Sequence, residues 1–173
     1  MSFEASLQFV LQQEGGFVDN PDDPGGATNH GITQATYDRY RSAKGLPTQS
    51  VSAVSEAETR EIYETLYWDA CRCGDIDRLA PGLALDVFDT AVNSGVGEAS
   101  KILQRLLQVT PDGHIGPQTL GALPGRDLRA LTEEYLWARL ALLTAIARRR
   151  PKSRQFLLAW VSRVVSLREE VRE

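Results

Sequence analysis

Residues 14–33, EGGFVDNPDDPGGATNHGIT, decide how this chain is organised. The stretch contains two Gly-Gly pairs, two prolines and three aspartates. Because proline and glycine interrupt helices and central strands alike, no long regular element fits here. The stretch also carries too many acids, amides and hydroxyls for a plain connector. It therefore predicts an ordered polar loop, with at most a small irregular hairpin between Phe17 and Thr33.

Glu14 stands between this loop and an amphipathic helix. Ser2 is placed to cap that helix, and Gly15 follows where helices commonly end in a left-handed turn. Apolar residues recur every three or four positions between them: Phe3, Leu7, Val10 and Leu11. A carboxyl group at the negative end of a helix dipole, against apolar neighbours, is favoured in the neutral form that a general acid needs. The alternative interpretation is a helix-end glutamate that only reaches into solvent.

The remaining sequence predicts helices joined by short turns, so the expected fold class is mainly α. Residues that cap or open helices recur along the chain: Ser55, Pro81, Pro117, Asp127 and Ser153. Residues 34–54 predict a short helix with Tyr37 and Tyr40, followed by a surface loop. The last helix is expected to turn these residues inward: Phe156, Leu157, Trp160, Val161 and Val164. Trp137 is also interpreted as a packing residue.

Three blocks of sequence resemble one known family, glycoside hydrolase family 108. The first and most specific is residues 14–33; residues 61–68 and 88–95 resemble its middle helix and the start of the peptidoglycan-binding half usually joined to it. Residues 103–104 and 112–120 continue that half, and its closing helix is resembled by Phe156, Trp160 and Arg163. The resemblance covers almost the whole chain of 173 residues. It implies a lysozyme-like helical catalytic half at residues 1–92, and a helical peptidoglycan-binding half at 93–173 that packs against it and shares its core.

The resemblance also implies an activity. Members are muramidases of phage endolysins and secretion-linked cell-wall enzymes, which cleave the β-1,4 bond between N-acetylmuramic acid and N-acetylglucosamine in peptidoglycan. Such enzymes need an acid and commonly a second carboxylate. The alternative is a non-hydrolytic wall-binding or secretion-assisting protein, although a retained Glu14 and the full polar loop argue against it.

Spacing similar to that of phage-type lysozymes suggests the catalytic residues. Glu14 is the expected acid, and Asp23 stands nine positions after it. Asp19 and Asp22 are rivals for the second role, and shaping the turn is the alternative for all three aspartates. Thr28, fourteen positions after Glu14, is expected to hold the attacking water. Whether cleavage retains or inverts the sugar configuration stays open.

Three further residues are candidates for binding the substrate. Asn29 is expected to contact a sugar hydroxyl or N-acetyl group. Tyr67 and Trp68 are adjacent and cannot face the same way, so one of them, Tyr67, is assigned to the cleft. Asn93 either caps a helix or faces the substrate from the second half of the chain.

No cofactor and no metal are expected. Cys71 and Cys73 are too close in sequence for an easy disulfide, and a single Cys-x-Cys lacks the other ligands of a zinc site. His30 and His114 are far apart and do not form a ligand pair. Ordinary reduced cysteines and isolated histidines are the simpler interpretation.

Charge is distributed unevenly around the net value of −4. Residues 1–123 carry 8 Lys+Arg and 17 Asp+Glu, a net charge of −9, whereas residues 124–173 carry 11 and 6, a net charge of +5. Five cations fall within seven residues: Arg148, Arg149, Arg150, Lys152 and Arg154. They indicate either a solvated turn or attraction to an anionic envelope surface. Nucleic acid is not expected, because no aromatic residues interleave with the cluster.

The sequence also bears on location. No run approaches the roughly 18–20 apolar residues of a membrane span, and no basic segment precedes an apolar core as in a conventional signal peptide. We therefore expect a monomer, made in the cytoplasm of a bacterial host, that acts on the cell wall in the periplasm after release. The resemblance implies holin lesions or a dedicated secretion route.

Overall fold

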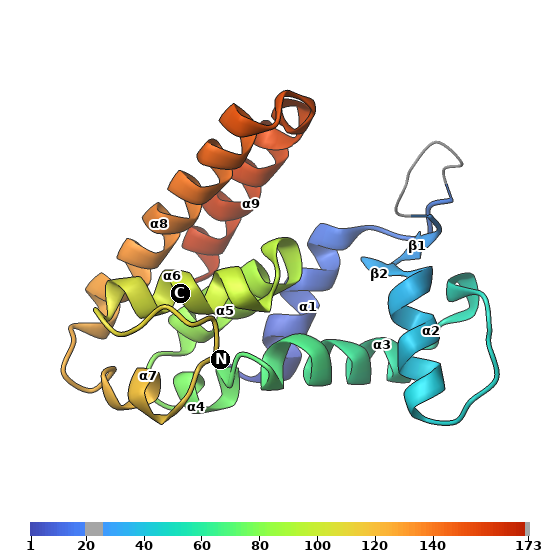
Figure 1. Ribbon diagram of the computed structural model, residues 1–173, viewed down its shortest axis with the longest axis horizontal. Coiled ribbons are helices and arrows are strands. Elements are labelled where there is room, and N and C mark those ends of the chain that lie inside the picture. The colour runs from blue at the N-terminus through green and yellow to red at the C-terminus, as the bar shows by residue number, and fades with distance from the viewer. Residues whose placement is uncertain (20–25, 172–173) are drawn as a thin grey trace. The chain divides into compact units, whose positions relative to one another are not determined.

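The computed structural model describes residues 1–19 and 26–171 (Figure 1). Helices dominate these residues, and the described strands form one small antiparallel pair, so the mainly α prediction is confirmed. The chain divides into two compact units. We call Leu7–Leu66 the hairpin unit, and Met1–Ser6 together with the chain from Tyr67 onward the helical unit. In the described part of the chain, no helix is both long and apolar enough to span a bilayer.

The hairpin unit is built around a tight β-turn. Strand β1 (Thr28–Asn29) pairs with β2 (Ile32–Thr33), Thr28 opposite Thr33 and Asn29 opposite Ile32. Between them His30 and Gly31 both have positive φ, 49° and 73°, which is the backbone of a type I′ turn. Val18 extends the hairpin through an isolated bridge to Thr28. The small hairpin expected between Phe17 and Thr33 is therefore present.

Helices of the hairpin unit begin and end at local signals. Its helices are α1 (Phe3–Glu14), which starts in the helical unit, α2 (Gln34–Ala43), the 3₁₀ turn η1 (Val51–Ala53) and α3 (Glu56–Tyr63). Ser55 and Glu58 form the predicted capping box of α3. Glu58 also accepts hydrogen bonds from Tyr37 at 2.9 Å and Arg41 at 2.7 Å, which ties α2 to α3.

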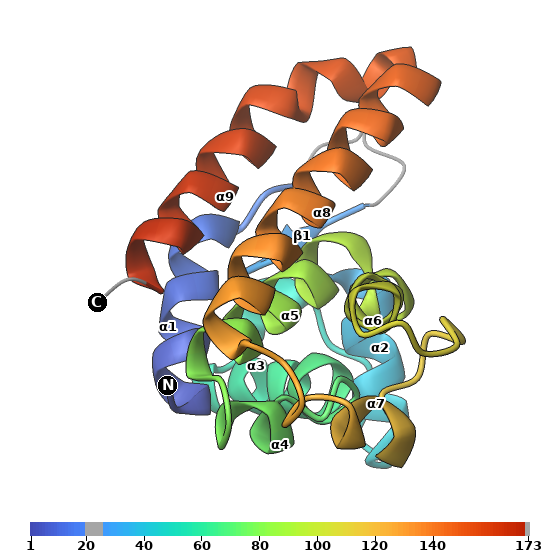
Figure 2. The same cartoon turned by 90° about the vertical axis from the view of Figure 1, so that its left-hand side faces the viewer.

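The π-helical turn η2 (Glu64–Asp69) carries the chain from α3 into the helical unit. The elements of that unit then follow in order: α4 (Cys73–Asp77), α5 (Pro81–Ser94), α6 (Val96–Leu106), α7 (Pro117–Gly121), α8 (Leu128–Arg149), the 3₁₀ turn η3 (Pro151–Phe156) and α9 (Leu157–Glu170). Helix α5 is its centre, buried without a break from Leu83 to Ala91 and in contact with α4, α6, α8 and α9. Helices α8 and α9 run side by side and are joined by η3 (Figures 1 and 2).

A buried ionic cluster joins α5 to this pair of helices. Asp89 lies on α5 and is fully buried. Arg163 of α9 contacts its carboxylate through Nε at 2.9 and 3.0 Å, and Arg139 of α8 through Nη1 at 2.6 Å. Asp86, one turn earlier, is buried with no hydrogen-bond partner for its carboxyl oxygens among the described residues. Burial raises the pKa of Asp86 well above its ordinary value, because loss of solvation disfavours the charged form.

A second polar anchor orders the loop between α6 and α7. Gln104 is buried and donates to the Asp112 carboxylate at 2.7 Å and to the His114 carbonyl at 2.9 Å. Its own carbonyl oxygen accepts from the backbone of Gly113. Two hydrogen bonds lower the pKa of Asp112: the larger effect comes from the Gln104 side chain and the smaller from the His114 backbone. This loop is therefore held by one glutamine side chain.

Four expectations about the final helices were wrong. Ser153 was expected to open the last helix, but it lies within the preceding turn η3, and α9 begins at Leu157. Trp137, Phe156 and Val161 are 66%, 50% and 37% exposed instead of packed inward. The reason is geometric: each of two paired helices buries the face turned to its neighbour, and an apolar period does not say which residues lie beyond that face. Val164 and Leu167 make the inward stripe of α9.

Candidate active site

Glu14 is the last residue of α1, as its position before Gly15 predicted. Gly15 has φ +71°, the left-handed conformation that ends many helices and that glycine adopts without strain. The Glu14 side chain is half-buried. The residue is therefore fixed at the end of a helix and is neither fully buried nor fully exposed.

The turn of the hairpin meets this carboxyl group at Gly31. A Cβ atom on Gly31 would lie 2.7 Å from Oε2 of Glu14 and 2.7 Å from the hydroxyl oxygen of Tyr63. Both separations are shorter than real Cβ atoms show, so any other residue would push the Glu14 carboxyl or the Tyr63 hydroxyl away, and the φ of +73° also favours glycine here. The carboxyl of Glu14, the backbone of Gly31 and the hydroxyl of Tyr63 thus come together at one point of the hairpin unit.

Tyr63 fixes the geometry of this point from α3. The residue is 1% exposed, and its hydroxyl donates to the His30 carbonyl at 2.7 Å. A buried tyrosine hydroxyl needs such a partner, and here the partner is the turn itself. The sequence interpretation did not single out Tyr63. Its signal was its place at the end of a helix whose register the capping box at Ser55 sets, but which turn it would meet depends on tertiary packing.

Thr28 and Asn29 lie on β1, in the strand that leads to this turn. The Thr28 hydroxyl donates to the Gly26 carbonyl at 3.3 Å. The Asn29 amide donates to the Val51 carbonyl at 3.2 Å, and the residue is 7% exposed. Asn29 therefore ties the hairpin to η1. Its contact with a sugar, and that of Thr28 with water, stay predictions.

The loop aspartates are only partly described. Asp23, the predicted second carboxylate, and its rival Asp22 lie outside the described residues. Asp19 is exposed and directly follows Val18, the residue that bridges to Thr28.

Tyr67 and Asn93 belong to the helical unit. Trp68 is buried there against Phe3 and Phe88, with ring centroids 5.4 Å away in each pair, while Tyr67 is half-buried. Asn93 is half-buried near the end of α5, and its carbonyl oxygen accepts from the Ser94 hydroxyl at 3.2 Å. The assignment of Tyr67 and Asn93 to the substrate stays a prediction.

The described residues bring no three His, Cys, Asp or Glu side chains together as a metal site requires. Cys71 and Cys73 are free thiols, both buried in the helical unit. The chemistry available at Glu14 is that of a carboxyl group beside a buried hydroxyl and a tight backbone turn, which suits proton transfer.

Two protein families match consecutive parts of the chain. Residues 7–95 match the family described as "Glycosyl hydrolase 108", and residues 98–165 match the one described as "Predicted Peptidoglycan domain". The matches change over between α5 and α6, whereas the compact units divide at Leu66 and Tyr67. The end of the first match therefore shares a core with the second.

Among solved structures, the chain is similar to SagA of Brucella abortus. The TM-score is 0.80 at 34% sequence identity, over 98% of this chain and 92% of that one. No curated protein matches the chain. The family match, the similarity to SagA over nearly its whole length and the glutamate at the end of α1 agree, and the chain therefore belongs to glycosyl hydrolase family 108, a glycoside hydrolase joined to a peptidoglycan domain.

Proposed function

We propose that this protein is a muramidase that cleaves the β-1,4 bond between N-acetylmuramic acid and N-acetylglucosamine in peptidoglycan. The observation that carries the proposal is the placement of Glu14, a half-buried residue at the end of α1 whose carboxyl group lies against Gly31 and close to the hydroxyl of Tyr63. Membership of the glycosyl hydrolase family and the attached peptidoglycan domain support the same substrate.

In this mechanism Glu14 is the general acid. Its proton passes to the glycosidic oxygen as the bond from that oxygen to the anomeric carbon breaks, and a second carboxylate faces the positive charge that develops on the sugar ring. We assign that role to Asp23. Water then adds to the anomeric carbon, and the proton that this water loses returns to the carboxylate of Glu14. Gly31 and Tyr63 are positioning residues, because they hold the acid and do not react.

The test of the acid is Glu14→Gln, which keeps the shape of the side chain but removes the transferable proton. Lysis of purified sacculi should fall by about two orders of magnitude or more, with an unchanged circular dichroism spectrum. Glu56→Gln is the matched control, because Glu56 is an exposed glutamate at the other end of a helix. Near-wild-type lysis by Glu14→Gln would make Glu14 structural.

The products identify the bond. Mass spectrometry of sacculus digests should find muropeptides with muramic acid at the reducing end. Reducing-end glucosamine, or cut peptides, would contradict the muramidase assignment. Wild-type protein that binds sacculi and releases nothing would instead favour the non-hydrolytic wall-binding or secretion-assisting protein.

The second carboxylate is tested by comparing aspartates of the same loop. Asp23→Asn should reduce turnover strongly, whereas Asp19→Asn should change it little. Equal, mild losses at Asp19, Asp22 and Asp23 would mean that these residues only shape the loop.

We also propose that the basic cluster recruits the enzyme to an anionic envelope surface once it has been released to the wall, as a phage endolysin or a secretion-linked enzyme. The cluster comprises Arg148, Arg149, Arg150, Lys152 and Arg154, which are exposed around η3, where α8 ends and α9 begins. Phe156 and Leu158 beside it are 50% and 79% exposed. Cations next to exposed apolar side chains suit a negatively charged surface.

A further inference from the structure

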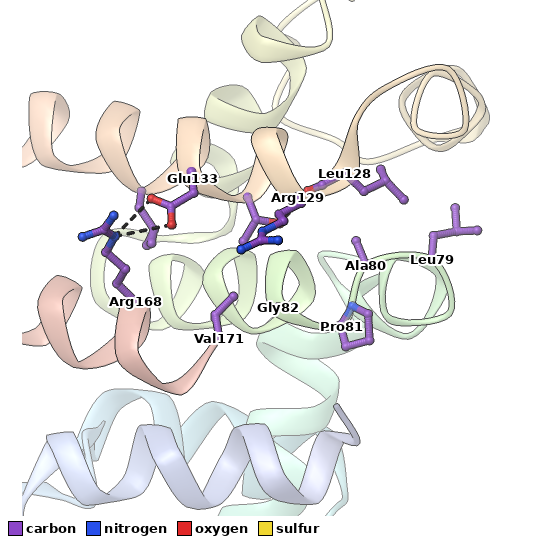
Figure 3. Close-up of a pocket in the computed structure, with 11 residues that line it drawn as sticks. Leu79, Ala80, Pro81, Gly82, Leu128, Arg129, Glu133, Arg168 and Val171 are labelled. Carbon is purple, nitrogen blue, oxygen red and sulfur yellow. Dashed lines mark hydrogen bonds and ion pairs between the residues drawn. The ribbon is translucent and has the colours of Figure 1, made fainter. Parts of the chain in front are cut away.

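A cavity of about 680 Å³ lies in the helical unit, where α5 and α8 begin and α9 ends (Figure 3). Gly82 allows Val171, which follows α9, to approach α5 closely, since a Cβ atom on Gly82 would lie 2.4 Å from Cγ1 of Val171. Cavities of roughly 300–1,000 Å³ hold small ligands. This one therefore suits a molecule of a few amino-acid residues.

One cation of this cavity has no ionic partner in the described chain. Arg168 donates from Nε to Glu133 at 3.1 Å, so these two charges offset each other. Arg129, on the same helix as Glu133, makes no ion pair with any described residue. Figure 3 shows its guanidinium in the space between α8 and the start of α5. A planar guanidinium binds a carboxylate through two parallel hydrogen bonds. Arg129 therefore suits a ligand with a free carboxylate group.

The rest of the lining is mostly aliphatic, and the hydroxyl of Thr132 is already bonded to the Leu128 carbonyl at 2.8 Å. Leu79, Leu128, Leu136 and Val171 contribute apolar surface, and no aromatic side chain is among the described residues that line the cavity. Sugars bind by stacking on aromatic faces, which are missing here, whereas aliphatic surface suits methyl side chains. The chemistry therefore favours the peptide part of peptidoglycan over its glycan.

We propose that this cavity binds the short stem peptide of peptidoglycan through a free carboxylate held by Arg129. Alanine methyl groups of the peptide pack on Leu128 and Leu136. The proposal rests on peptidoglycan as the substrate and adds a non-catalytic contact with it. A second contact raises the effective concentration of the enzyme at the wall between cuts.

The test uses the full chain and a peptide that has no glycosidic bond. Synthetic L-Ala-γ-D-Glu-meso-diaminopimelyl-D-Ala is titrated while backbone amide shifts are followed by NMR. Shifts are expected at Arg129, Glu133 and neighbouring residues of α8. The same peptide with every carboxylate amidated, and tetra-N-acetylglucosamine, should leave these amides unmoved. Sugar-induced shifts there, with none from the peptide, would overturn the proposal.

Two arginine variants then test whether Arg129 binds the carboxylate of the peptide. Arg129→Gln should weaken peptide binding about tenfold, and because Arg129 is exposed the variant should fold normally. Arg105→Gln removes the same charge from an exposed site on α6 and should bind the peptide like the wild type. Equal affinities for wild type and Arg129→Gln would reject the site.

Binding to sacculi and cleavage of glycan strands, measured separately, distinguish peptide binding in the cavity from muramidase activity. Arg129→Gln should bind intact sacculi more weakly in a pelleting assay, yet cleave peptide-free glycan strands at the wild-type rate. Unchanged pelleting would count against the cavity. A wild-type protein that cleaves neither substrate would overturn the muramidase proposal instead, and the peptide titration would still decide the cavity.

Discussion

The hydroxyl of Tyr63 donates to the carbonyl oxygen of His30 at 2.7 Å, so the last residue of α3 holds the turn of the hairpin. The next residue of that turn, Gly31, is the one against which the Glu14 carboxyl lies. The orientation of the proposed acid thus depends on a hydrogen bond that involves neither the acid nor the substrate.

Tyr63→Phe removes only this hydroxyl. A buried carbonyl left without its donor costs about 1–3 kcal/mol, and we expect the hairpin unit to lose stability in that range and lysis to fall about tenfold. Hydrogen-exchange mass spectrometry of β1 and β2, with lysis assays, measures both effects. Tyr40→Phe is the control, because its hydroxyl donates to Glu61, whose side chain is 42% exposed, and it should lyse like the wild type.

Gly31→Ala tests the close approach to Glu14. The variant combines a strained φ of +73° with a Cβ 2.7 Å from the Glu14 carboxyl, so lysis should be lost or nearly lost. Gly15→Ala has a similar positive φ but no atom within 4 Å, and it reports the strain alone, about 1–2 kcal/mol. Gly16→Ala has neither and should be neutral. Equal lysis by Gly31→Ala and Gly15→Ala would show that the close approach does not matter.

Asp89→Asn tests the buried ionic cluster. The substitution leaves the guanidinium groups of Arg139 and Arg163 without their carboxylate, and breaking a buried pair in this way costs about 3–5 kcal/mol. Urea unfolding followed by tryptophan fluorescence measures the loss. Asp75→Asn, which breaks exposed pairs with Arg72 and Arg78, should cost less than about 1 kcal/mol. Similar losses in the two variants would rule out a special cost of burial.

Acid should loosen α2 and α3 through Glu58. Burial alone raises the pKa of this carboxyl, but hydrogen bonds from Ser55 and Tyr37, with the charge of Arg41, outweigh it and lower the pKa below the ordinary 4.5. Because the folded pKa is the lower one, this stabilisation is present above pH 4.5 and is lost as the pH falls through the folded value. The protection factors of the amides in α2 and α3, which correct exchange rates for the pH dependence of intrinsic exchange, should therefore fall below pH 4.5 in the wild type. In Glu58→Gln these protection factors should be lower at pH 7 and depend less on pH, and parallel pH profiles would contradict this role.

Neutralising Arg148, Arg149 and Lys152 to glutamine tests recruitment to the envelope. Binding to intact cells should weaken most at low salt, and the difference from wild type should shrink as salt screens charges beyond about 10 Å near 0.1 M. Cleavage of soluble wall fragments should not change. Arg39, Arg78 and Arg105, neutralised together, are the control for net charge, because all three are exposed. No change in cell binding at any salt concentration would indicate a plain solvated turn.

Local signals predicted much of this fold from the sequence. The capping box at Ser55, the cap at Asp127, the helix-opening Pro81 and the left-handed Gly15 are all present, since each acts within a few residues of itself. The exposure of Trp137 was not predictable in this way, because it depends on which helix lies beside α8.

In the candidate site, too, residues set by local signals could be predicted and residues set by tertiary packing could not. Glu14 was identifiable because helix end, glycine and polar loop follow one another in the sequence. Tyr63 was not, since it lies 49 residues later and meets Glu14 and Gly31 only after α3 has packed on the hairpin. The place of Asp23 beside Glu14 remains a prediction.

The buried Asp89 also limits how such proteins can recombine. It lies on α5, within the segment that matches the glycosyl hydrolase family, yet both its countercharges come from helices of the segment that matches the peptidoglycan family. A gene fusion that joined residues 7–95 to an unrelated wall-binding domain would leave the buried carboxylate of Asp89 without Arg139 and Arg163. The two segments are thus separable in sequence comparisons, but the core around Asp89 needs both of them.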